Sequence, residues 1–136
     1  MRLVFGLFAI LVGAAGPGQA QEAPSCEAAA TQLAMNECHA KAFGVSDGKL
    51  NELYRMVEGR LADNAHARDL LVQAQRRWIA FRDAECAFEA SGVDGGSIQP
   101  MILSLCLTSL TDTRVEDLQR LLSCEEGDTS CPVPPA

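Results

Sequence analysis

Cysteine is the residue type in this sequence best suited to chemistry, and six are present: Cys26, Cys38, Cys86, Cys106, Cys124 and Cys131. A cysteine thiolate can attack a substrate, bind zinc or pair into a disulfide. Zinc sites need ligands at short spacing, yet the sequence has no C-x-x-C pair, and His39 and His66 lack partners at ligand spacing. We therefore expect three disulfides, no metal site and no other cofactor.

The first twenty residues indicate the compartment in which these cysteines function. Arg2 precedes an apolar run over 3–12, and Gly18-Gln19-Ala20 supplies a small-x-small cleavage site, which together predict a cleavable signal peptide over 1–20. The apolar run is shorter than the roughly 20 residues of a membrane-spanning helix. Cys26 follows Ala-Pro-Ser and not a lipobox, so no membrane anchor is expected after cleavage. The prediction is a periplasmic or secreted protein, in a compartment where disulfides persist.

No other residues form a recognisable catalytic arrangement. His39 and His66 each lie among ordinary helix residues, without a Ser/His/Asp or Cys/His pattern. Glu85 and Glu89 are four residues apart, a spacing that is more typical of a solvated helix face than of an acid and base pair. The sequence therefore predicts that the protein is not an enzyme.

The charge of the chain restricts its partners. The net charge is −7, and removal of Arg2 with the signal peptide makes it −8, with the acids densest at Glu125, Glu126 and Asp128. This balance excludes nucleic acid as a natural partner. An acidic surface either steers the protein towards a basic envelope protein or serves solubility alone.

The elements that must position these residues are helices. Helical periodicity runs over about 26–43, 47–62, 65–90 and 97–122, with breaks at Gly44, at Asp63-Asn64 and at the glycines of 92–96. Short connections make neighbouring helices antiparallel. We predict an all-α fold, a small antiparallel four-helix bundle stapled by disulfides. One domain spans 26–122, between a short leader over 21–25 and an acidic, proline-containing tail over 123–136 that is expected to be poorly ordered.

The third helical segment carries a seam of apolar residues at three- and four-residue steps: Leu71, Ala74, Trp78, Phe81 and Phe88. Such a seam requires partner helices. We expect Trp78 and Phe81 to lie in the core.

The helical arrangement favours particular disulfides. Cys86 lies nine residues before Gly95 and Cys106 ten after Gly96, so an antiparallel hairpin places them at similar heights, and this pair is ranked first. Cys26 can pair with Cys38 if the first helix begins near Thr31 and the preceding residues fold back. The crossed pairs Cys38–Cys86 and Cys26–Cys106 remain open, and Cys124–Cys131 would close a small loop in the tail.

Seven polar residues lie near the apolar stripes and need partners if they are buried: Asn36, Asn51, Tyr54, Gln75, Arg82, Asp83 and Arg114. Arg82 and Asp83 are adjacent and point about 100° apart on a helix, so each is expected to find another partner. We predict a structural network between helices, with a ligand site as the alternative.

The loop Val93-Asp94-Gly95-Gly96-Ser97 forms an exposed tip between glycines. Loops on rigid bundles often carry recognition, so this segment is the candidate partner-binding site. A plain turn is the alternative.

Several strings together resemble the LprI-type lysozyme-inhibitor family. They are CEAAATQLAMNEC from Cys26, D-x-x-L-N-x-x-Y from Asp47, QRRWIAFRDAEC from Gln75 and GGSIQPMILSLCLTSLT from Gly95. The resemblance implies an exported helical domain, lipid-anchored in some members, for which lysozyme inhibition has been proposed. This chain departs from the pattern because it lacks a lipobox and adds Cys124 and Cys131.

Two functions are compatible with these features. The first is an exported binding protein that inhibits a cationic lysozyme by occlusion, with lysozyme or another basic envelope protein as its partner. The alternative is a periplasmic structural or envelope-stress interaction protein without lysozyme activity, because a shared fold does not fix a function.

Overall fold

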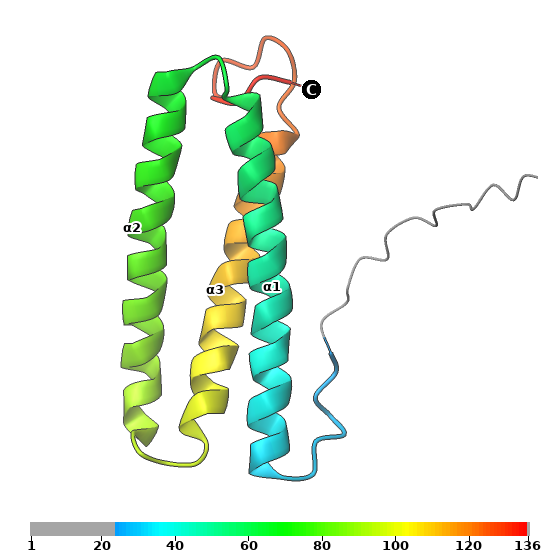
Figure 1. Ribbon diagram of the computed structural model, residues 1–136, viewed down its shortest axis with the longest axis vertical. Helices are drawn as coiled ribbons and strands as arrows, with labels where there is room; N and C mark the ends of the chain where they lie inside the picture. Colours follow the sequence, from blue (N-terminus) through cyan, green and yellow to red (C-terminus); the bar gives the residue numbers. More distant parts are fainter. Residues whose placement is uncertain (1–23, 136) are drawn as a thin grey trace, which may run out of the picture.

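The computed structural model describes residues 24–135, and within them the chain forms three α-helices. They are α1 (Gln32–Arg60), α2 (Ala65–Ala90) and α3 (Gln99–Leu122), with a 3-10 turn η1 (Ser91–Val93) between the last two. The helices run up, down and up in antiparallel order (Figure 1). The all-α prediction is confirmed, but the predicted four-helix bundle is a three-helix fold. The predicted signal peptide and most of the leader lie outside the described residues.

The difference arises in α1, which continues through Gly44, where the sequence predicted a break. Ala42, Ser46, Leu50 and Val57 are all buried on one continuous face of this helix. A glycine costs a helix about 1 kcal/mol relative to alanine, which is less than such a buried face contributes when it packs against a neighbouring helix. Packing therefore outweighs the local signal for a break.

The N-terminus of α1 is set by a cap and a disulfide. The Thr31 Oγ1 accepts a hydrogen bond from the Ala34 N–H at 3.1 Å, which satisfies one of the free donors of the first turn. The helix therefore begins at Gln32 and not near Cys26 as the periodicity suggested. The residues before it fold back, and Cys26 is bonded to Cys38 with their Cα atoms 5.7 Å apart.

Helix α3 packs along both of the other helices, whereas the backbones of α1 and α2 approach each other at few points. In Figure 1, the first part of α3 lies between the two, and its second part passes behind α1. The buried core consists of Leu50, Val57, Leu61, Leu71, Val115, Leu118 and Val133. The Cys86–Cys106 disulfide links α2 to α3, with a Cα separation of 5.5 Å.

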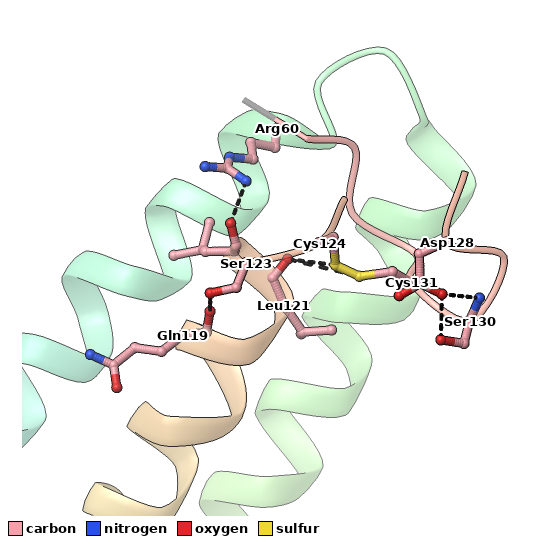
Figure 2. Close-up of a disulfide and its surroundings, with 9 residues drawn as sticks. Arg60, Gln119, Leu121, Ser123, Cys124, Asp128, Ser130 and Cys131 are labelled. Atoms are coloured by element: carbon pink, nitrogen blue, oxygen red, sulfur yellow. Dashed lines mark hydrogen bonds between the residues drawn. A yellow bond between two sulfur atoms is a disulfide. The ribbon is translucent and has the colours of Figure 1, made fainter. Parts of the chain in front are cut away.

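The segment after α3 is more ordered than the sequence predicted. Cys124 is bonded to Cys131, and Figure 2 shows that this disulfide closes a small loop beyond the end of α3. The bridge turns the chain back, so that Val133 packs into the core and is only 3% exposed. The expectation of a poorly ordered tail is therefore wrong at this position. The Cys86–Cys106 bond is the pair ranked first, and the Cys26–Cys38 and Cys124–Cys131 bonds exclude the crossed pairs that the sequence left open.

The apolar seam predicted on α2 is only partly buried. Leu71 is buried and Trp78 packs against the core, but Phe81 is 54% exposed and Phe88 is 73% exposed. Ala74 is also exposed. The prediction that Phe81 lies in the core is wrong because α2 contacts α3 along a face about a quarter turn away, through Gln75, Arg82 and Cys86.

Candidate functional site

Arg82 lies at the centre of a buried polar cluster contributed by all three helices. Its side chain donates to Asp47 on α1 at 3.2 Å, to Thr111 on α3 at 3.3 Å and to its neighbour Asp83 at 2.9 Å. The bond to Asp83 corrects the expectation that these adjacent residues could not pair, since the flexible Arg side chain turns back along the helix. Arg82 is only 7% exposed, so these bonds compensate for its desolvation.

Aromatic rings enclose the same guanidinium group. The Arg82 Cζ lies 5.3 Å from the centroid of the Phe43 ring and 5.2 Å from that of Trp78, both within the range of a cation–π interaction. Arg114 on α3 approaches the Trp78 ring at 6.0 Å and donates to the Gln75 side chain at 3.2 Å. Arg82 is thus fully occupied by the protein, an arrangement suited to holding three helices in register.

The remaining residues of the predicted network fall into separate places. Asn51 donates to the Asp47 backbone oxygen at 2.8 Å and to its carboxylate at 2.9 Å, and so supports the Arg82 cluster. Asn36 on α1 instead donates to the Ser97 backbone oxygen at 2.9 Å, in the loop between α2 and α3. The pKa of Tyr54 is raised, first by burial and then by Glu58, with an opposing effect from Arg76. Sequence reasoning missed Thr111, whose hydroxyl carries no sequence signal of burial.

The loop Val93–Ser97 is tied to the helices around it. Gln99, which the sequence did not single out, accepts a hydrogen bond from the Gly95 N–H at 3.1 Å and donates to the Asp94 carboxylate at 2.5 Å. Gly95 has φ +73°, a conformation that favours glycine, and a Cβ on Gly96 would lie 3.0 Å from the Val93 oxygen. Together with the bond from Asn36 to Ser97, these contacts give the tip a defined shape.

The end of the bundle that carries this loop is acidic; we call it the loop end, residues 24–41 and 84–105. The start of α1, the end of α2 and the start of α3 meet there (Figure 1). It contains one cation, Lys41, and five acids: Glu27, Glu37, Glu85, Glu89 and Asp94. The formal charge of the loop end is therefore 1 − 5 = −4. Such a surface favours a cationic partner.

A family comparison agrees with this architecture. The family model described as "Lysozyme inhibitor LprI" matches residues 24–118. This chain belongs to the LprI family. The match contains the Cys26–Cys38 and Cys86–Cys106 disulfides, the Arg82 cluster and the loop end, and it ends before Cys124. The LprI segment thus includes most of the described helices, and the tail disulfide lies beyond it.

One relative of this LprI protein is an uncharacterized protein of Rhizobium meliloti (strain 1021). It is 32% identical over 139 residues, which cover 93% of this chain and 100% of the relative. No solved structure matches the chain.

An open apolar cavity lies at the opposite end of the bundle from the loop end. Its volume is about 310 Å³, and it is lined by Val57, Leu61, Ala67, Leu70, Leu71, Ala74, Arg114, Leu121, Pro132 and Val133. All three helices and the segment after α3 contribute to its wall. Among residues 24–135, no cluster of three His, Cys, Asp or Glu side chains is arranged to hold a metal ion. None of the described helices is both long and apolar enough to cross a membrane.

Proposed function

We propose that this protein is an exported, non-catalytic inhibitor that binds a cationic lysozyme and occludes its cleft. The observation that carries the proposal is the match of residues 24–118 to a family described by lysozyme inhibition. Three disulfides within residues 24–135 fit a chain that works outside the cytoplasm. The N-terminal sequence pattern provides the route of export.

Electrostatics supports the choice of partner. Lysozymes cut peptidoglycan with two carboxylates in an open cleft, and those of animal hosts are usually strongly cationic. The mature protein, whose net charge is −8 and whose loop end has formal charge −4, would be steered towards such an enzyme. This steering increases the association rate and weakens as salt screens the charges.

The loop Val93–Ser97 is the part of the loop end that we expect to enter the cleft. Gln99 and Asn36 hold this loop in one shape through side-chain hydrogen bonds. A loop fixed before binding loses little conformational entropy when it docks, so a short contact can still contribute useful affinity. The Asp94 carboxylate is exposed at this tip.

The test is a lysozyme assay on purified cell walls, with the oxidised mature protein added in increasing molar ratio at low and moderate salt. We expect inhibition that is stronger at low salt. The variant Glu89→Gln/Asp94→Asn removes two charges from the loop end and should weaken inhibition. The matched control Asp63→Asn/Asp69→Asn removes two charges near the start of α2, at the other end of the bundle, and should weaken it less.

Absence of inhibition at large molar excess would remove the proposal. In that case, capture of an endogenous partner from envelope extract would favour the alternative of a structural or envelope-stress protein. Equal loss of inhibition in the two double variants would retain inhibition but reject the loop end as its site.

A further inference from the structure

One exposed face of α2 carries a continuous stripe that the three-helix fold leaves uncovered; we call it the α2 seam. Its members are Leu70, Ala74, Arg77, Phe81, Ala84 and Phe88, and all six are exposed. They follow one another at alternating steps of four and three residues. This is the spacing of the a and d positions of a coiled coil, the face through which one helix packs against another helix.

From this arrangement we propose that the α2 seam is a self-association surface, on which the α2 helix of a second copy packs in antiparallel orientation about a two-fold axis. The occupant is a second copy because the seam is complementary to itself when reversed. Leu70 and Phe88 each lie nine residues from Ile79, which is about 13.5 Å along the helix in either direction. Ala74 and Ala84 each lie five residues from it, and Arg77 and Phe81 two.

A two-fold axis at the level of Ile79 therefore pairs each large side chain with a suitable neighbour. Arg77 of one copy faces Phe81 of the other, a cation–π pair that also places the one charged member of the seam favourably. Ala74 faces Ala84, and these small side chains allow the two backbones to approach closely. Ala80 and Ala87, on the adjoining face of α2, are also small and exposed.

Charge complementarity favours the same orientation. The first half of α2, up to Arg77, carries three arginines and one acid, Asp69. The second half carries Asp83, Glu85 and Glu89, while its single arginine, Arg82, is buried and already bonded to Asp47 and Asp83. Antiparallel packing lays the basic half of each helix along the acidic half of the other, but Arg68 and Arg76 point more than about 100° away from the seam, so this attraction acts at long range. Parallel packing would instead bring like charges together.

The apolar cavity gives the seam a second point of fit. Leu70 and Ala74 belong both to the seam and to the lining of the 310 Å³ cavity. The two-fold pairing sets Phe88 of the second copy beside Leu70, at the mouth of this cavity. Among residues 24–135, Phe88 is the most exposed large apolar residue, at 73%, and the symmetry places both copies of it against a cavity at once. Phe88 of each copy and the cavity of the other copy then belong to the same interface.

The first test is the molar mass of the oxidised mature protein, measured by light scattering across a dilution series from the millimolar to the micromolar range. We expect twice the monomer mass at high concentration. Phe88→Asp and Phe81→Asp should each raise the dimer Kd at least about thirtyfold, because a buried aromatic anchor commonly contributes that much. The control Leu33→Asp changes an equally apolar, 67% exposed residue of α1 that lies off the seam, and it should leave the dimer intact.

The second test fixes the orientation by oxidative cross-linking of Ala74→Cys and Ala84→Cys variants. A mixture of the two should give the heterodisulfide, and either variant alone should stay largely uncross-linked. Homodisulfides of Ala74→Cys would overturn the antiparallel register. A wild-type chain that is monomeric at all concentrations, or a control as disruptive as Phe88→Asp, would overturn the whole inference. Circular dichroism of every variant confirms that the helices are retained, since the substituted side chains are exposed.

Discussion

The face between α1 and α3 and the outer face of α2 contain similar apolar side chains, but they differ in what covers them. Leu50, Val57 and Leu118 are at most 2% exposed where α1 meets α3, whereas Leu70, Phe81 and Phe88 on α2 are more than half exposed. Helix α2 is held to the bundle by one disulfide, the Arg82 cluster and a narrow contact with α3. The bundle therefore derives its stability mainly from one pair of helices, and it presents the third to solvent.

The largest expected effect is in the α1–α3 core. Leu118→Ala removes a side chain that is 0% exposed, and we expect a loss of about 2–5 kcal/mol in the free energy of unfolding, because the surrounding residues cannot close the cavity. Leu70→Ala is the matched change on α2, where the side chain is 53% exposed, and it should cost well under about 1 kcal/mol. Urea unfolding at a concentration where the chain is monomeric measures both. Equal losses would refute the contrast between the two faces.

The disulfides should come next, because they close loops of different length. Replacing Cys86 and Cys106 by serine opens a separation of 20 residues and should cost about 3 kcal/mol. The same change at Cys124 and Cys131 opens a separation of 7 residues, and its direct entropic cost should be smaller. Thermal unfolding of the two double variants checks this order. A larger loss at the tail pair would mean that Val133 contributes more to the core than the loop length suggests.

The Arg82 cluster is expected to have a moderate effect. Arg82→Ala removes bonds to α1 and α3 together with contacts to two aromatic rings, and it should cost about 2 kcal/mol. Arg77→Ala, on the exposed seam of the same helix, should change the stability of the monomer by less than about 0.5 kcal/mol. If Arg82→Ala kept full stability but lost lysozyme binding, the cluster would be a ligand site and not a structural one.

Much of this architecture follows from local patterns. The helical periodicity gave the bounds of α2 and the end of α3 closely, and antiparallel geometry alone placed Cys86 level with Cys106. Two features were not predictable in this way. The break expected at Gly44 is absent because a long-range partner, α3, stabilises the helix across the glycine. The burial of Val133 depends on a turn that the Cys124–Cys131 bridge imposes, which a proline-rich tail does not indicate.

The errors on α2 have a different origin. A 3.6-residue period identifies an apolar stripe on a helix, but it does not determine whether other helices of the same chain bury that stripe. Leu71 and Trp78 of the predicted seam do pack inward, whereas Phe81 and Phe88 do not. The candidate loop was found from its glycines, yet its rigidity depends on Gln99 and Asn36, whose roles are visible only once the helices are placed.

The smallest predicted effect is the pH dependence that Tyr54, on α1, gives to the stability of the fold. The pKa of Tyr54 is raised above its ordinary value of 10.0 by burial and by Glu58, and Arg76 across the gap opposes this. The folded protein thus holds the phenol proton more tightly than the unfolded chain does. The resulting stabilisation is complete below pH 10 and is lost as the pH rises through the folded-state pKa. Tyr54→Phe should abolish this alkaline loss.

Because Tyr54 is the single tyrosine of the chain, phenolate absorbance reports its titration alone. Glu58→Gln should lower the midpoint, and Arg76→Gln should raise it, since the first removes a negative neighbour and the second a positive one. If Arg76→Gln left the titration midpoint of Tyr54 unchanged, Arg76 on α2 would be too far from Tyr54 on α1 for its charge to act on the phenol. The gap between α1 and α2 at Tyr54 would then be wider than the hydrogen bond from Arg82 to Asp47 implies.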